Sequence, residues 1–466
     1  MAHDLTYSDA TQLAELIRTR KVSTVQVIQA HLDRINAVNP ALNAIVSINP
    51  HALEAAKDAD AAIASGKDLG PLHGVPFTVK DSIDTAGVPT QRGSPIFKDR
   101  IPETDAVSVA RMKSAGGILL AKTNLPEFSY STESDNLLTG RSNNPWNLDR
   151  TPGGSSGGES AAIAAGLSPL GLGTDLAISV RGPAAQTGIV SLKATHGRVP
   201  MTGIWPRAPR RFWHVGPMAR SIRDLDLAYS ILAGPDGHDA YSTIMNKEGP
   251  KIQGRKVRVG WMTGPGFGPI DPQVRSAVKA AAEALNKADC IVESVNIPAL
   301  ERDFALDVFM RIHVNDMKPD FEAATQGQPD DHIFKIARNM LKRSETSAKD
   351  FIKAEKAADR LKDAFAEYFD SFDILLCPVL PTPAHKHGAS DLTIDGQTVN
   401  ATYVMASTVP FNVTGLPAVS MRFGTSEDGL PIGVQLVAGW SNERMLLSVA
   451  SRFESVSPVK DLHPKL

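Results

Sequence analysis

Residues 151–182 concentrate glycine, serine and small apolar residues, and two of their serines are placed to do chemistry. Ser155 lies within the sequence GGSSGG at 153–158, and Ser179 lies shortly after the sequence GTD at 173–175. Glycine has no Cβ atom and permits positive φ, so backbone N–H groups in such a run can converge on an anion or on the oxyanion of a reacting carbonyl. The run therefore predicts a site that stabilises negative charge beside a serine.

Two familiar motifs fit this run poorly. Residues 153–160 have the spacing of a phosphate-binding loop, but Glu159 occupies the position of its lysine, and a carboxylate there would repel a phosphate. Residues 153–157 formally match G-x-S-x-G, a nucleophile turn that follows an apolar strand. The preceding residues 147–152, NLDRTP, are polar and do not predict such a strand. Both interpretations are therefore disfavoured.

The run closely resembles the signature of the amidase signature family, serine hydrolases that cleave amide bonds with a Ser, cis-Ser, Lys triad. That resemblance requires a lysine after a buried strand upstream, and the sequence GVPFTVKD at 74–81 supplies Lys80. The resemblance covers most of the chain. It implies that Ser179 is the nucleophile, that Ser155 is the bridging serine with a cis peptide bond, and that Lys80 is the base.

The resemblance also implies the residues that support the triad. Backbone N–H groups of residues 176–179, namely Leu176, Ala177, Ile178 and Ser179, would hold the oxyanion. Asp175 and Arg181 would brace this turn, although an ordinary structural ion pair is the alternative, and Ser156 would lie beside them. Phe128 matches a position at which the family lines its substrate pocket.

A lysine serves as a base only when its amine is neutral. The unperturbed lysine pKa is about 10.4, so Lys80 would have to be desolvated and surrounded by hydroxyls rather than carboxylates. A proton would then pass from Ser179 through Ser155 to Lys80, and later return to the departing amine. Two other residues invite the wrong assignment: Lys122 matches a family position outside the triad, and Cys377 has no base beside it in the sequence.

The chain departs from the family pattern in two places. Ala177 and Ile178 replace the common Gly-Gly before the nucleophile, and a β-branched residue is disfavoured at positive φ. The turn must therefore adopt a more regular backbone or carry strain, and Ile178 suggests an unusual substrate range. In residues 205–217, aromatic and basic residues replace small hydroxyl residues, so Trp205 and Trp213 either line a substrate pocket or pack in a plain loop.

The resemblance implies an α/β fold in one large domain, residues 1–466, with a central twisted mixed β-sheet covered by helices on both faces. Length alone would suggest two or three domains. We expect an N-terminal helical segment over 1–65, the signature core over 70–200 and a variable helical region over 300–370. The sequence also predicts a βαβ unit, with strands at 257–261 and 291–295 around a helix at 272–286.

Composition limits the partners and cofactors. The net charge of −2, with both signs interspersed, argues against nucleic acid, and no apolar run approaches the roughly 18 residues that would cross a membrane. The polar N-terminus has no signal-peptide pattern, so a cytoplasmic location is expected. Only Cys290 and Cys377 occur, with no metal-binding spacing, so we expect no metal and no cofactor.

The sequence thus favours an amidohydrolase acting on a small-molecule amide, or a related hydrazide or ester, as a monomer or homodimer. Within the family, the alternative is the glutaminase subunit of a tRNA-dependent amidotransferase, which the replacement at 177–178 and the altered 205–215 loop argue against. A catalytically silent binding protein on the same fold is a further alternative. Retention of Lys80, Ser155 and Ser179 together argues against it.

Overall fold

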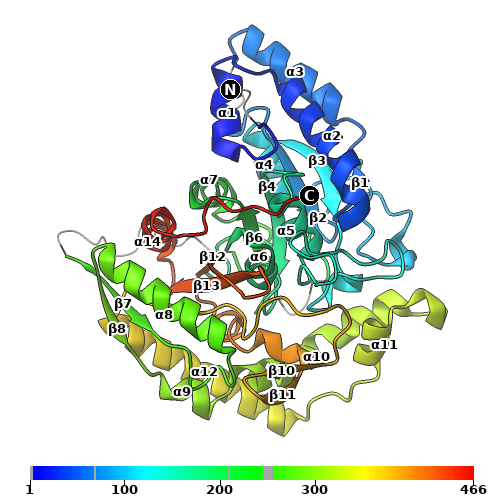
Figure 1. The fold of residues 1–466 in the computed structure, drawn as a ribbon. Coiled ribbons are helices and arrows are strands. Elements are labelled where there is room, and N and C mark those ends of the chain that lie inside the picture. The colour runs from blue at the N-terminus through cyan, green and yellow to red at the C-terminus, as the bar shows by residue number, and fades with distance from the viewer. Residues whose placement is uncertain (1–3, 68–69, 208–209, 243, 245–254) are drawn as a thin grey trace.

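One mixed sheet runs through the molecule (Figure 1). The computed structural model describes residues 4–67, 70–207, 210–242, 244 and 255–466. Within these ranges, eleven strands join in the order β1–β3–β2–β4–β6–β5–β12–β13–β9–β7–β8. Their bounds are β1 Ile45–Ile48, β2 Pro76–Lys80, β3 Ile118–Thr123, β4 Leu170–Asp175, β5 Val190–Lys193, β6 His214–Ala219, β7 Val257–Trp261, β8 Cys290–Ser294, β9 Ile374–Pro378, β12 Ala418–Thr425 and β13 Pro431–Ala438. The predicted α/β fold with a mixed sheet is confirmed.

Helices cover both faces of this sheet. Successive strand residues point to opposite faces, so apolar residues on each face need a helix layer to bury them. In β9, Ile374 and Leu376 join one hydrophobic cluster, while Leu375 and Cys377 join another. Helices α4, α7 and α14 pack in the first cluster, and α10 and α12 in the second. The α-helices are α1 Ala10–Arg18, α2 Thr24–Leu42, α3 Ala52–Ala64, α4 Val107–Ser114, α5 Gly157–Ala164, α6 Arg181–Thr187, α7 Ile222–Leu232, α8 Pro272–Lys287, α9 Pro298–Arg302, α10 Ala305–Thr325, α11 Lys335–Leu341, α12 Ala348–Ser371, α13 Pro410–Val413 and α14 Glu443–Ser455.

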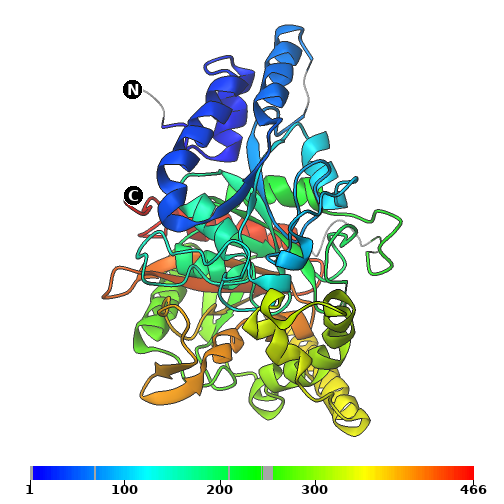
Figure 2. The same ribbon diagram turned by 90° about the vertical axis from the view of Figure 1, so that its right-hand side faces the viewer.

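Short elements complete the fold. The hairpin of β10 (Asp391–Ile394) and β11 (Gln397–Asn400) stands apart from the main sheet. Short 3-10 helices are η1 Pro95–Phe97, η2 Glu127–Ser129, η3 Asp330–His332 and η4 Ala401–Met405. Figures 1 and 2 place α1–α3 at one end of the molecule and α10–α12 at the other.

The order of strands brings three parallel strand ends to one edge of the sheet. Strand β2 pairs in parallel with β3 on one side and with β4 on the other. Loops that follow the carboxyl ends of parallel strands meet at one edge, where α/β proteins commonly bind their ligands. Lys80 at the end of β2 therefore lies on the edge at which β4 ends in Asp175.

The N-terminal segment differs in two details from what its residues predict. Asn39-Pro40 predicts the end of a helix, but α2, which begins with a capping box at Ser23, continues to Leu42, with Asn43 (φ 49°) as its C-cap. Pro40 lies in the last turn, so the hydrogen bond that its missing N–H removes is at the end of the helix and not in its interior. Strand β1 also lies within the segment expected to be helical, where it pairs with β3 at the edge of the sheet.

The predicted βαβ unit is present. Strands β7 and β8 are parallel neighbours joined through α8. The region 300–370 is largely helical, with α10 and α12 as its long helices.

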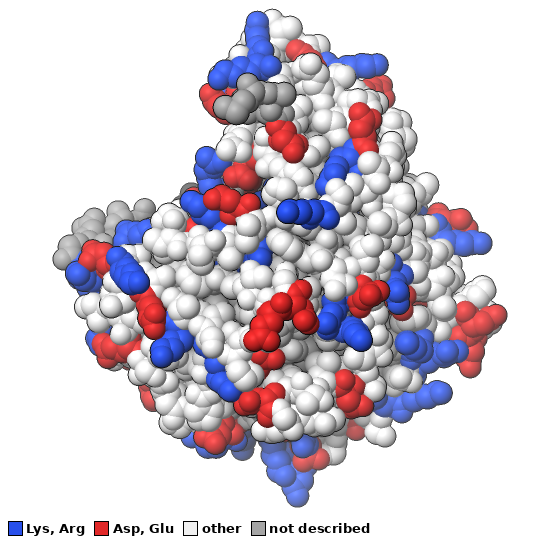
Figure 3. Space-filling model, viewed as in Figure 1, with Lys and Arg blue, Asp and Glu red and all other residues white. Residues whose placement is uncertain are grey.

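Lys and Arg side chains are interspersed with Asp and Glu over the face seen in Figure 3. Among the described residues, no helix is both long enough and apolar enough to span a bilayer.

Candidate active site

Lys80 contacts Ser155, the serine to which the resemblance gives the bridging position. Strand β2 is buried along its whole length, and it ends with the Lys80 side chain fully enclosed. The Lys80 amine hydrogen-bonds the hydroxyl of Ser155 over 2.6 Å and that of Thr174 over 2.9 Å. The nearest polar partners of the amine are therefore hydroxyls, as predicted.

This environment favours the neutral amine. Burial lowers the pKa of Lys80 to about 7, although the charges of Asp175 and Glu159 act in the opposite direction. Glu159 is itself buried in α5, where it accepts hydrogen bonds from Thr78 and, over 2.8 Å, from Thr123. Burial raises the pKa of Glu159 to about 8, which reduces the negative charge that this carboxyl group contributes beside Lys80.

The glycine-rich run brings the two serines onto neighbouring backbone. The peptide bond between Gly154 and Ser155 is cis. Gly154 cannot carry a side chain, because a Cβ atom there would lie 2.5 Å from the backbone nitrogen of Glu133. The N–H of Ser156 donates to the carbonyl of Ser179 over 3.1 Å, which holds the turn of Ser179 against the Ser155 segment.

The turn at residues 176–179 leaves its backbone donors available. None of the four N–H groups donates a hydrogen bond to any residue that the structure describes. Neither Ala177 nor Ile178 has a positive φ, so the turn takes the more regular of the two backbones that the sequence allows. The Ile178 side chain is buried against Val379 and Leu380. The four donors are thus not used by the described part of the protein, as an oxyanion-binding turn requires.

Asp175 and Arg181 form a buried ion pair next to this turn. Asp175 accepts hydrogen bonds from the N–H of Val180 at 3.1 Å, from Arg181 Nε at 3.1 Å and from Asn412 Nδ2 at 2.9 Å. All of these side chains are buried. Burial alone would raise the pKa of Asp175, but Arg181 and Asn412 lower it to about 2. The charged carboxylate therefore fixes both ends of the turn through hydrogen bonds.

Three buried polar residues complete this arrangement without having been singled out as site residues from the sequence. They are Thr174, Glu159 and Asn412. Thr174 and Glu159 lie within the glycine-rich run, so an analysis of which residues flank Ser155 and Ser179 could have found them. Asn412 is separated from Asp175 by 237 residues, and only the pairing of distant strands brings it there. Ser156, the remaining predicted neighbour, contacts the backbone of Thr174 through its hydroxyl.

The predicted pocket residues come together in part. The rings of Phe128 and Trp205 meet edge to face with centroids 5.0 Å apart, and Phe321 lies 5.1 Å from Phe128. Trp213 is buried in the same hydrophobic cluster, which also includes Leu176 and Ala177 of the turn. Part of the 205–217 loop, residues 208–209, lies outside the described residues.

Lys122 and Cys377, the two residues that invite the wrong assignment, have other surroundings. The Lys122 amine lies 3.5 Å from Asp81 and donates to the carbonyl of Ile83 over 2.8 Å and to the hydroxyls of Thr85 and Thr90 over 3.1 and 2.6 Å. Cys377 is buried in β9, and burial raises the pKa of its thiol. A buried, protonated thiol is a poor nucleophile. Within the described residues, no group of three or more His, Cys, Asp or Glu side chains could hold a metal ion.

Known proteins resemble this chain over almost its whole length. The family model named Amidase matches residues 26–447. An acylamidase of Rhodococcus erythropolis is 33% identical over 490 residues, covering 99% of this chain and 98% of that protein. A glutamyl-tRNA(Gln) amidotransferase subunit from Bdellovibrio bacteriovorus is 32% identical over 497 residues, covering 99% of both chains.

A solved structure shows the same architecture. The structure of a 6-aminohexanoate cyclic dimer hydrolase, complexed with its substrate, superposes with a TM-score of 0.86 at 29% identity. The match covers 99% of both chains. The fold is thus shared along the full length of that hydrolase.

Proposed function

We propose, since the chain belongs to the amidase family, that it hydrolyses small-molecule amides through an acyl-enzyme formed on Ser179. Membership makes the protein a hydrolase of carbon–nitrogen bonds. The observation that carries the finer proposal is the contact between the buried Lys80 amine and the Ser155 hydroxyl, at 2.6 Å. An amine with a pKa of about 7 can take up and return a proton near neutral pH.

In the proposed reaction, the Ser179 Oγ attacks the carbonyl carbon of the amide. Its proton passes to the Ser155 hydroxyl, which transfers its own proton to the Lys80 amine. The oxyanion accepts hydrogen bonds from the free N–H groups of residues 176–179. As the tetrahedral intermediate collapses, the carbon–nitrogen bond breaks and a proton returns through Ser155 to the departing amine. Water then attacks the acyl ester by the same proton route and releases the carboxylic acid and free Ser179.

The pair of Asp175 and Arg181 would act as a positioning device. Hydrogen bonds from Val180, Arg181 and Asn412 to the Asp175 carboxylate hold the backbone on which the four donors lie. A donor stabilises the transition state only if its direction is fixed before charge develops, because otherwise the reaction must reorient it. The buried ion pair therefore supplies preorganisation rather than direct contact with the substrate.

A glutaminase that works within a larger assembly is the alternative, because an amidotransferase subunit is 32% identical over nearly the whole chain. The purified chain distinguishes the two. A stand-alone amidase, acting as a monomer or homodimer, is fully active by itself on aryl amides, alkyl amides, hydrazides or ureas. A glutaminase of this kind would act on glutamine, and its activity would rise when a partner chain is added.

The direct test is covalent labelling by a fluorophosphonate probe followed by peptide mass spectrometry. We expect the label on Ser179 in the wild-type protein and none on that peptide in Ser179→Ala. A Cys377→Ala variant is the matched control and should label as the wild type does. If the wild-type protein failed to label at Ser179 but bound amides, it would be a silent binding protein. Loss of activity on thiol alkylation to the same extent as with serine probes would overturn the serine assignment.

A further inference from the structure

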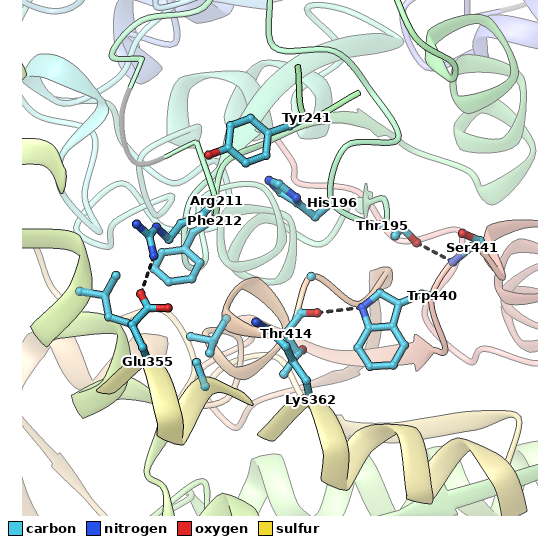
Figure 4. A pocket seen from close by; sticks show the side chains of 14 residues that line it. Thr195, His196, Arg211, Phe212, Tyr241, Glu355, Lys362, Thr414, Trp440 and Ser441 are labelled. Carbon is cyan, nitrogen blue, oxygen red and sulfur yellow. Dashed lines mark hydrogen bonds and ion pairs between the residues drawn. The ribbon is translucent and has the colours of Figure 1, made fainter. Parts of the chain in front are cut away.

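A cavity lies beside the segments that follow β5 and precede β12. Its volume is about 450 Å³, within the range of pockets that hold small organic molecules. None of Lys80, Ser155 or Ser179 lines it. Figure 4 shows Arg211, Phe212 and Glu355 on one side, Trp440 and Thr195 on the other, and His196 between them.

The walls of this cavity are mainly aromatic and aliphatic. Phe212, Tyr241 and Trp440 present rings, and Ile312, Ala358 and Val413 add aliphatic surface. Contacts between aromatic rings in offset or edge-to-face geometry contribute beyond the burial of apolar area. The walls thus favour a flat, apolar ligand.

The charged groups at the cavity are already paired within the protein. Arg211 lies 3.0 Å from Asp316 and also contacts Glu355, while Lys362 hydrogen-bonds Asp359 over 3.1 Å. Two of the wall's neutral polar groups are occupied as well, since the Trp440 indole donates to Thr414 and Thr195 accepts from the N–H of Ser441. An ionic ligand would have to displace these contacts, so an uncharged one is favoured.

One acceptor remains available in the wall. The Nε2 atom of His196 lies 2.7 Å from the carbonyl of Arg210, and a carbonyl can only accept, so Nε2 carries the proton. Burial lowers the pKa of His196, which keeps the ring neutral and leaves Nδ1 with a lone pair. Nδ1 has no hydrogen-bond partner among the residues that the structure describes. A ligand hydroxyl or amine can supply the missing donor.

We propose that this cavity binds a small uncharged aromatic molecule carrying one hydroxyl or amine donor, at a site separate from Ser179. The rings of Phe212, Tyr241 and Trp440 would enclose the aromatic part, and His196 Nδ1 would accept the donor. The inference rests on the cavity itself, so it stands or falls independently of the proposed hydrolysis.

The test uses the full-length protein and ligand-observed NMR titrations. The probes are 4-methylphenol, 4-methylanisole, which lacks the donor, and 4-methylbenzoate, which carries a charge. We expect 4-methylphenol to bind about tenfold more tightly than 4-methylanisole, the effect of one net hydrogen bond. Binding of 4-methylbenzoate should be weaker still. Absence of 4-methylphenol binding, or tighter binding of 4-methylbenzoate, would overturn the proposed ligand class.

Three variants locate the binding. Ala358→Phe fills the cavity and should weaken 4-methylphenol binding at least about tenfold. Ala366→Phe makes the same change at an exposed position of the same helix, α12, and should bind as the wild type does. His196→Phe should bring the two neutral probes to equal affinity. Circular dichroism checks that each variant is folded. Unchanged affinity in a folded Ala358→Phe protein, or a retained preference in a folded His196→Phe protein, would overturn the site.

Discussion

Lys80 and Lys122 are two buried lysines on neighbouring parallel strands, and they differ in what their amines touch. In the β2–β3 register Val79 is opposite Lys122, so the two lysines are one residue out of register and their side chains point to opposite faces of the sheet. Both are fully buried. Lys80 contacts the hydroxyls of Ser155 and Thr174. Lys122 also donates to two hydroxyls, those of Thr85 and Thr90, but in addition it donates to the carbonyl of Ile83 and lies 3.5 Å from the carboxylate of Asp81.

Burial alone does not make a lysine a base. Burial lowers the pKa of both amines, to about 7 for Lys80 and to about 8 for Lys122. Hydroxyl contacts alone do not separate the two amines, but the carboxylate of Asp81 beside Lys122 favours a charged amine there, whereas Lys80 contacts Ser155, whose neighbour Ser156 is hydrogen-bonded to Ser179. We therefore propose catalysis for Lys80 and structural support for Lys122.

The largest effect is expected in the proposed relay itself. Ser179→Ala and Lys80→Met should each lower kcat/KM by roughly 10⁴-fold or more, because they remove the nucleophile or its base. Lys80→Met leaves no buried charge without a partner of opposite sign, since its nearest contacts are neutral hydroxyls. Steady-state kinetics on the best amide substrate, together with urea unfolding, measure both properties. A Lys80→Met protein with more than a tenth of wild-type activity would contradict the assignment.

Lys122→Met should show the opposite pattern. It leaves Asp81 buried without its cation, so the free energy of unfolding should fall by roughly 3–5 kcal/mol. The double variant Lys122→Met, Asp81→Asn is the control and should recover part of that loss. Activity per folded molecule should remain near that of the wild type at a temperature where the variant is folded. Loss of activity in the folded protein would place Lys122 in the catalytic machinery.

Asn412→Ala should have an intermediate effect. Without its amide, Asp175 loses a hydrogen bond at 2.9 Å and holds the oxyanion turn less rigidly. We expect kcat to fall roughly 10- to 100-fold with little change in KM, somewhat less than the loss of one oxyanion donor. Asn412→Asp keeps the shape but places a second carboxylate beside Asp175, so it should be worse than alanine. An effect confined to KM would assign Asn412 to substrate binding instead.

The pH dependence gives a smaller effect with a definite sign. The base must be the neutral amine, and the Lys80 pKa is lowered to about 7, so kcat/KM should rise as the pH passes from 6 to 8 and then level off. Thr174→Val removes one of the two hydroxyl partners of the amine and should move the midpoint of this rise. Lys122→Met should leave the midpoint nearly in place. A profile that is flat from pH 6 to 8 would contradict the role of Lys80.

Cys377→Ala should have the smallest effect. The thiol is buried in β9, and burial raises its pKa, so it supplies neither a nucleophile nor a proton acceptor at neutral pH. We expect unchanged kcat/KM and a modest loss of stability from the small cavity. Denaturant unfolding and steady-state kinetics measure the two separately.

Local sequence predicted the elements that carry the site but not the contacts between them. The glycine-rich run and the strand before Lys80 were recognisable because their chemistry lies in consecutive residues. The packing of Asn412 on Asp175 depends on β12 lying between β5 and β13, a pairing of strands far apart in the chain. Similarly, Glu159 in α5 accepts hydrogen bonds from the hydroxyls of Thr78 in β2 and Thr123 in β3, which lie far from it in the sequence.

The ending of α2 shows the same limit on a smaller scale. Pro40 predicts an earlier end to the helix, yet the helix continues to Leu42, and the N–H of its C-cap Asn43 donates to the carbonyl of Asn39 over 2.7 Å. The Asn39 side chain in turn accepts from the N–H groups of Ala44 and Ile45, at 2.8 Å each. These contacts lead directly into β1, so the hydrogen bonds of Asn39 outweigh the helix-ending signal of the proline.

The most direct test of the account is the pKa of the Lys80 side chain in the folded protein. Protein labelled with ¹³C at the lysine ε-carbon can be titrated by NMR, and the Lys80 signal assigned as the one absent from Lys80→Met. The account predicts a midpoint near pH 7, with a neutral amine above it. A midpoint near the unperturbed lysine value of about 10.4 would show a protonated amine at neutral pH and would contradict the proposed base.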